Sequence, residues 1–195
     1  MRLNLKDILV FKAFTLTELI VGTAILVIIT GLLFTLLLGM LDISELGSTE
    51  SRVQQEARQA MEIMTSELKS SDRTKIVLPA GPSYSPTISF YLPTDLDGDG
   101  TIIAAATGNI EWNPTVYTYS IVSGPMGISQ LRRTGGGQPD KVLANYVVSV
   151  LFADHNIDAN LALDEARIIL KVRKNVPKKQ RPFEVELNGV VKLRN

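Results

Sequence analysis

The hydrophobic pattern changes twice along this chain. An uncharged apolar run extends from Leu19 to Leu41. From Glu50 to Ser71 the apolar residues recur at three- and four-residue steps with charged residues between them, which predicts an amphipathic helix. Beyond Pro79 apolar and polar residues alternate, and this period of two predicts half-buried strands.

These patterns together predict an α+β fold. The amphipathic segment carries its apolar residues at Val53, Ala57, Ala60, Met61, Met64 and Leu68. The alternating segments are Ile88, Phe90, Leu92; Tyr117, Tyr119, Ile121; Val148, Val150, Phe152; Ile168, Leu170, Val172; and Phe183, Val185, Leu187. Turn-rich stretches separate them and favour antiparallel hairpins over crossover helices. We therefore expect a long N-terminal helix, half membrane-spanning and half amphipathic, packed on an antiparallel β-sheet.

The first apolar run is long enough to cross a bilayer. As a helix it would measure about 35 Å, against a hydrocarbon core of about 30 Å. Cations dominate the residues before it and acids follow it, so the positive-inside rule places the N-terminus in the cytoplasm and the rest outside. The residues concerned are Arg2, Lys6 and Lys12 with one acid, Asp7, before the run, and Asp42, Glu45 and Glu50 after it.

Two simpler interpretations compete with an assembly helix. A secretory signal peptide also has a basic start and an apolar run, but here the run is too long, Glu18 stands at its start, and no clear small-x-small cleavage site follows it. A plain single-pass anchor stays open, since Glu18 could lie among the lipid headgroups.

The residues around Glu18 resemble a known processing signal. The segment Lys12-Ala13-Phe14-Thr15-Leu16-Thr17-Glu18-Leu19 is similar to the class III signal of type IV pilins and type II secretion pseudopilins. That signal is usually a basic residue, Gly, Phe, Thr, Leu, any residue, Glu and Leu, and here Ala13 replaces the glycine. The resemblance implies that prepilin peptidase cuts between Ala13 and Phe14 and that the new amine of Phe14 is methylated.

The same resemblance gives Glu18 a role in assembly, as the partner of the Phe14 amine of a neighbouring subunit. Physical chemistry supports this role independently. An ionised acid deep in hydrocarbon costs roughly 2.5 to 3.5 kcal/mol, and a cation a few ångströms away offsets that cost. Only the terminus of a second chain would lie at the same depth. Gly22, Gly31 and Gly39 would give close-packing surfaces for neighbouring helices.

Later segments extend the resemblance along nearly the whole chain. Arg58–Met64, the Asp95–Gly100 turn, Val142–Asn145 and the ending Val191–Asn195 resemble PilW/PulJ-type minor pilins and pseudopilins. This implies a structural subunit of the bacterial inner membrane that helps to start or cap a fibre, with sister pilins, prepilin peptidase and the bilayer as partners. The expected divisions are a leader at 1–13, a membrane helix at 14–41, an amphipathic helix at 42–73 and an extracytoplasmic β-rich domain at 74–195.

Composition fits a tethered structural domain without catalytic activity of its own. The chain has 20 basic and 20 acidic residues, so no net charge points to nucleic acid as an obligate partner. It has no cysteine, which excludes disulfides and thiolate chemistry. His155 is the only histidine and is expected in an exposed turn, because a zinc site or a catalytic triad would need partners that the sequence lacks.

Two acidic loops are the candidates for a metal, and Ca²⁺ is the only cofactor that the sequence suggests. Asp95, Asp97 and Asp99 alternate before a turn and match the first half of a calcium loop, with Gly100 at the sixth position and Ala106 at the twelfth, where a glutamate is usual. In the second loop Asp154, Asn156, Asp158, Asn160 and Glu165 match the ligand positions, but Ala159 replaces the glycine. Polar hairpin tips closed by Asx turns are the alternative for both.

A basic tip supports the main alternative function. Lys174, Lys178, Lys179 and Arg181 form a cluster that could contact DNA or anionic lipid, although a solvated loop is the simpler interpretation. The alternative is a binding module at the fibre tip, for DNA uptake or surface adhesion on the same anchor. A third class, a tethered calcium-dependent enzyme, lacks a recognisable set of nucleophile, acid and base.

Overall fold

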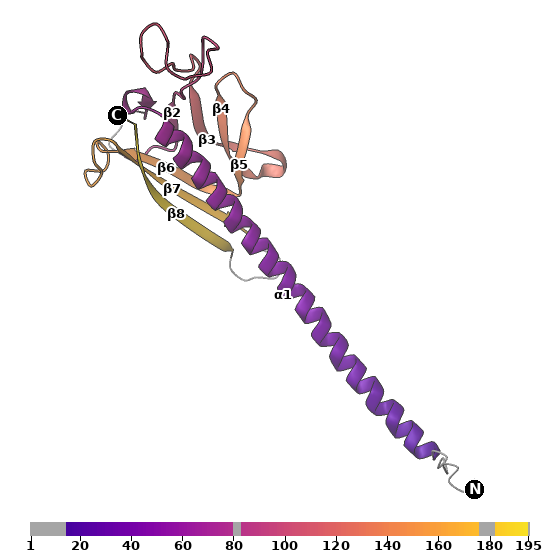
Figure 1. The fold of residues 1–195 in the computed structure, drawn as a ribbon. Coiled ribbons are helices and arrows are strands. Elements are labelled where there is room, and N and C mark those ends of the chain that lie inside the picture. Colours follow the sequence, from indigo (N-terminus) through magenta and orange to yellow (C-terminus); the bar gives the residue numbers. More distant parts are fainter. Residues whose placement is uncertain (1–14, 80–82, 176–181, 195) are drawn as a thin grey trace, which may run out of the picture. The chain divides into compact units, whose positions relative to one another are not determined.

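A single long helix begins the fold. The computed structural model describes residues 15–79, 83–175 and 182–194, and within them α1 runs from Leu16 to Ser70 without interruption (Figure 1). The chain divides into two units, Met1–Gly47 and Ser48–Asn195, so the boundary falls inside this helix. The sequence Gly47-Ser48-Thr49 therefore marks the unit boundary but does not end the helix. The predicted amphipathic helix ends at Ser70 and not at residue 73, because a short 3-10 turn, η1, follows at Arg73–Lys75.

The second unit contains eight described strands in two antiparallel sheets. The five-stranded sheet is formed by β1 (Ile76–Val77), β2 (Ile88–Phe90), β3 (Tyr117–Ser123), β4 (Ser129–Gly135) and β5 (Lys141–Asn145). The three-stranded sheet is formed by β6 (Val147–Asp154), β7 (Glu165–Lys174) and β8 (Phe183–Lys192). Strands adjacent in the chain are neighbours within each sheet. The predicted α+β class and antiparallel hairpins are therefore confirmed.

The division into two sheets was not expected from the sequence. It falls between β5 and β6, where Tyr146 has a φ of 60°, in the left-handed region that non-glycine residues rarely adopt. Tyr146 is the only residue between the two strands, and its left-handed conformation breaks the extended backbone there. β5 pairs with β4, whereas β6 pairs with β7.

The amphipathic stripe of α1 supplies one side of the core. Its residues Val53, Ala57, Ala60, Met64 and Leu68 are all buried, as the periodicity predicted, and Met61 is half-buried. Figure 1 shows this part of α1 beside the three strands β6, β7 and β8. The opposing side comes from both sheets, with the buried residues Phe90, Tyr119, Phe152, Ile168 and Leu170. One core thus joins the helix to the two sheets.

Two details of the strands differ from the predicted pattern. At the start of β6, Val147 is buried and the predicted Val148 is 44% exposed, because the pairing with β7 shifts register between Val147 and Ser149. A bulge of this kind moves the side chains that follow it to the other face. The strands β1, β4 and β5 were not among those predicted, and in β4 Leu131 is the only buried residue.

Candidate functional site

A reciprocal capping interaction holds Glu18 at the beginning of α1. The Thr15 backbone N–H and the Thr15 hydroxyl both donate to Oε2 of Glu18, each at 2.9 Å. The Glu18 backbone N–H donates in return to the Thr15 hydroxyl at 3.3 Å. Thr15 directly precedes α1, so Thr-x-x-Glu here is a capping box, which satisfies backbone N–H groups that a helix start leaves without partners.

This geometry gives Glu18 a structural role within its own chain. Both hydrogen bonds from Thr15 end on the same carboxylate oxygen, Oε2. Within the described part of the chain, the second oxygen, Oε1, forms no hydrogen bond or ion pair. The predicted cleavage residues Ala13 and Phe14 lie outside the described residues, so the predicted approach of the Phe14 amine stays a prediction.

A shallow groove lies directly beside the Glu18 carboxylate. Its lining consists of Glu18, Leu19, Gly22, Thr23 and Leu26, and its volume is about 240 Å³. Gly22 lines it, and the space above this residue is open, because a Cβ placed there would meet no atom within 4 Å. The surface is thus open to another chain at the position of the acid.

The helix around this groove has the length and composition of a membrane span. The segment Leu16–Leu41 covers 26 residues, and Glu18 is the only charged residue in it. Its apolar side chains are exposed. Three threonine hydroxyls donate to backbone carbonyls one turn earlier, Thr23 to Ile20, Thr30 to Leu26 and Thr35 to Gly31, at 2.8 to 2.9 Å. These hydroxyls would therefore need no water in hydrocarbon.

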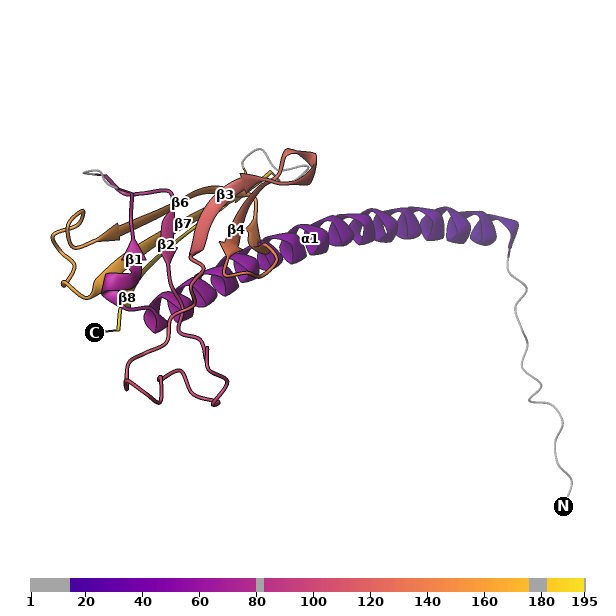
Figure 2. The same cartoon turned by 90° about the horizontal axis from the view of Figure 1, so that it is seen from above.

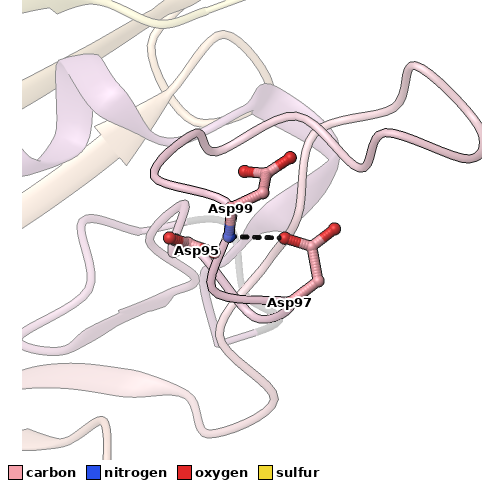
Figure 3. A group of neighbouring side chains, drawn as sticks. All are labelled: Asp95, Asp97 and Asp99. Atoms are coloured by element: carbon pink, nitrogen blue, oxygen red, sulfur yellow. Dashed lines mark hydrogen bonds between the residues drawn. The ribbon is translucent and has the colours of Figure 1, made fainter.

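The first acidic loop lies in the long connection between β2 and β3, which projects away from both sheets (Figures 1 and 2). Asp95, Asp97 and Asp99 lie together there, with one carboxylate oxygen from each within 4.8 Å of the others (Figure 3). All three side chains are exposed.

Backbone hydrogen bonds explain the shape of this loop. Asp95 accepts from the N–H groups of Gly98 at 2.6 Å and Gly100 at 2.8 Å. These hydrogen bonds hold the pKa of Asp95 below its usual value, and the bond from Gly100 has the larger effect. Asp97 accepts from the N–H of Asp99 at 3.1 Å, the bond drawn in Figure 3. The carboxylates thus already close Asx turns, as the alternative interpretation expected, while their oxygen-rich grouping suits a hard cation. Calcium binding stays a prediction.

The predicted acidic ligands of the second loop, Asp154, Asp158 and Glu165, do not form such a group. Among the described residues, Asp95, Asp97 and Asp99 are the only acidic, histidine or cysteine side chains grouped closely enough for a metal. Asp158 is buried and pairs instead with Arg167 at 2.5 Å and with the Tyr84 hydroxyl at 2.8 Å. Asp154 accepts from the N–H of Asn156 at 3.0 Å. Glu165 turns back to accept from the N–H of Ala162 at 2.9 Å.

The only histidine, His155, forms a hydrogen bond within this loop. Nδ1 of His155 lies 2.5 Å from the carbonyl oxygen of Leu161. Because a carbonyl only accepts, this ring nitrogen carries the proton. The predicted turn position of His155 is confirmed, but its side chain is half-buried rather than exposed.

A partly buried polar cluster between helix and sheet was not predicted from the sequence. The Glu67 carboxylate of α1 accepts from the Tyr119 hydroxyl of β3 and from the Arg133 guanidinium of β4. Tyr119 and Arg133 are directly opposite each other in the β3–β4 pair. Burial, followed by the bond to Glu67, raises the pKa of the Tyr119 hydroxyl. The only sequence feature that could have indicated this cluster is Glu67 itself, a carboxylate next to the apolar stripe of the helix.

No family model, curated protein or solved structure matches this chain. The predicted basic tip contributes Lys174 to the described chain, where its ammonium lies 4.7 Å from the centre of the Tyr146 ring. Lys178, Lys179 and Arg181 lie outside the described residues.

Proposed function

We propose that this chain is a minor pilin or pseudopilin, a structural subunit that enters the inner membrane and helps to start or cap a fibre. The observation that carries the proposal is the position of Glu18. It is the only charged residue of an exposed apolar segment long enough to cross a membrane, and one of its carboxylate oxygens is engaged by Thr15.

The Glu18 carboxylate has no cationic partner among the described residues. A capping box satisfies helix N–H groups, but it brings no cation to Glu18. In a low-dielectric environment an unpaired carboxylate is costly, and pairing with a cation a few ångströms away is the usual compensation. The amine created by cleavage before Phe14 is a cation of suitable depth, and it would come from a neighbouring subunit.

The surface beside Glu18 supports a helical neighbour. Gly22 leaves room for close approach, and Leu19 and Leu26 give the groove apolar walls. Small residues let helix backbones approach in a bilayer, where packing rather than the hydrophobic effect drives association. In this proposal the neighbouring helix lies in the groove and its terminal amine reaches Oε1 of Glu18.

The substitution Glu18→Gln separates this role from helix capping. Glutamine also serves as the fourth residue of a capping box, so the variant keeps the helix start while losing the charge. We expect Glu18→Gln and Glu18→Ala to reach the membrane at normal levels and to enter fibres at less than a tenth of the wild-type level. The assay is quantitative immunoblotting of sheared fibre and membrane fractions.

The control is Glu62→Gln, which removes one exposed acid elsewhere on α1 and should enter fibres normally. Normal incorporation of Glu18→Gln would refute pairing with an amine and leave Glu18 as a helix cap. Mass spectrometry of the membrane form tests processing separately. A mature chain that begins at methylated Phe14 supports the proposal, and a chain that keeps its leader contradicts it.

A further inference from the structure

One end of the second unit combines an exposed apolar tip with cations. Three segments meet there: the 3-10 turn η2 (Pro125–Gly127) between β3 and β4, the β5–β6 junction at Tyr146, and the end of β7 at Arg173–Lys174. The Arg173 N–H donates to the Tyr146 carbonyl at 2.9 Å. A groove of about 420 Å³ joins all three and is lined by Gly127, Ile128, Ser129, Tyr146, Val147, Val148, Arg173 and Asn175. We call these segments the Met126 end.

Its apolar groups are unusually open to solvent. Met126 is 94% exposed, the highest value of any large apolar side chain described. It has a φ of 56°, where glycine would be the ordinary residue. Val148, which lines the groove, is 44% exposed. A flexible thioether side chain held at a turn tip is suited to enter an apolar phase.

The charges at this end favour an anionic partner. Arg173 is exposed, and Lys174 lies over the Tyr146 ring. Glu184, which lies opposite Arg173 in the β7–β8 pair, forms its ion pair with Lys171 at 2.8 Å, and Glu56 pairs with Arg52 at 3.4 Å. Glu186 lies 3.8 Å from the same Lys171.

The Met126 end is also the end of the domain nearest, along the chain, to the apolar segment of α1. The Nδ2 group of Asn145, next to Tyr146, donates to Glu56 at 3.3 Å. At the opposite end, Arg194 donates its N–H to the carbonyl oxygen of Ser71, just beyond α1. Glu56 follows Leu41, the end of the candidate span, by a path of about 22 Å if helical. The Met126 end therefore belongs to the part of the second unit that follows the candidate span most closely along the chain.

We propose that the Met126 end docks on an anionic bilayer while the chain is anchored and not yet assembled. This rests on the membrane anchor of the proposed function. Met126 enters the headgroup region, and Arg173 and Lys174 contact lipid phosphates. Each cation near such a surface contributes about fivefold to the docking equilibrium. Assembly into a fibre would then compete with docking.

The test uses the full chain in lipid nanodiscs. The chain has no cysteine, so Met126→Cys and Gln138→Cys each accept one environment-sensitive fluorophore. Gln138 is exposed in the β4–β5 connection, at the other end of the β3–β4 pair. Quenching by brominated lipid is measured in discs of pure phosphatidylcholine and in discs with about 30% phosphatidylglycerol.

We expect strong quenching at position 126 only in anionic discs, and none at position 138. Arg173→Gln with Lys174→Gln should lower the docking equilibrium about 30-fold. The matched control, Lys141→Gln with Lys192→Gln, removes two charges away from the Met126 end and should leave quenching unchanged.

Other results would overturn the inference. Absent quenching at position 126, equal quenching in both lipids, or an equal effect of the control pair would each refute docking. Loss of duplex DNA binding in the Arg173 and Lys174 variant, with unchanged quenching, would assign the cations to DNA instead. A chain that enters the discs without quenching refutes docking alone. A chain that fails to enter them refutes the anchor, and docking with it.

Discussion

Replacing Glu67 by glutamine should destabilise the second unit more than any other single charge removal on the helix. Glu67 accepts from Tyr119 and Arg133 at the junction of α1 with β3 and β4. The Glu67 and Arg133 side chains are 17% and 18% exposed, so both charges are largely removed from water. Glutamine still accepts a hydrogen bond from Tyr119, but it leaves the Arg133 guanidinium without its counter-charge.

The size of the effect follows from this burial. Breaking a buried ion pair by removing one partner costs about 3 to 5 kcal/mol, and the residual exposure of this pair favours the lower value, about 3 kcal/mol. With a urea dependence of about 2 kcal/mol/M for a domain of this size, the unfolding midpoint should fall by about 1.5 M. Unfolding can be followed by the fluorescence of Trp112, the only tryptophan, with the full chain in detergent micelles.

Two further variants define the interpretation. Glu62→Gln removes an exposed acid from the same helix and should shift the midpoint by less than about 0.25 M. Glu67→Gln combined with Arg133→Met removes both charges and should recover part of the loss, because no unpaired cation remains. A Glu67→Gln midpoint within about 0.2 M of the wild type would refute the assignment of this cluster as the link between helix and sheet.

Three further predictions concern the loops and turns. Gly135→Ala should destabilise the domain by about 2 kcal/mol or more in the same urea assay. Gly135 has a φ of 93°, and an added Cβ would lie 1.9 Å from the Val116 carbonyl oxygen. The control Gly47→Ala changes a helical position with open space around it and should not destabilise the domain. The bond from Tyr84, followed by the N–H of Asn160, lowers the pKa of Asp158, so its contribution to stability is complete above about pH 4 and is lost as the pH falls further. Asp158→Asn should therefore be less stable at pH 6 and lose less stability between pH 4 and pH 2 than the wild type does; identical slopes would contradict this. If the first acidic loop binds calcium, calorimetric titration should detect binding to the wild type that Asp95→Asn abolishes, and no heat with either protein would identify the loop as a set of Asx turns.

Local patterns predicted the elements of this fold better than their assembly. The burial of Val53, Met64 and Leu68 followed directly from helical periodicity, because one face of a helix must meet the core. The division into two sheets depends on the backbone of Tyr146, and no residue type predicts a left-handed tyrosine. Similarly, β4 carries one buried apolar side chain, so its place in the sheet is set by backbone pairing rather than by pattern.

The candidate site divides in the same way. The sequence identified Glu18 as anomalous because charge in an apolar run is visible in one dimension. It did not identify the Thr15 cap, although Thr-x-x-Glu is a readable signature, because the family resemblance gave the same residues another meaning. The ligand spacing of the second acidic loop was misleading, since Asp158 pairs with Arg167 of the following strand and with the hydroxyl of Tyr84, which is distant in the sequence.

The attachment of α1 to the sheets has a mechanical consequence. Val53, Ala57, Ala60, Met64 and Leu68 form a row along the helix, and Glu67 fixes its far end to two strands. A pull along the helix axis from its N-terminal side would load this whole row in shear, so the contacts would have to yield together rather than one after another. A force applied through the apolar segment Leu16–Leu41 would therefore reach the domain without first separating the helix from the sheets.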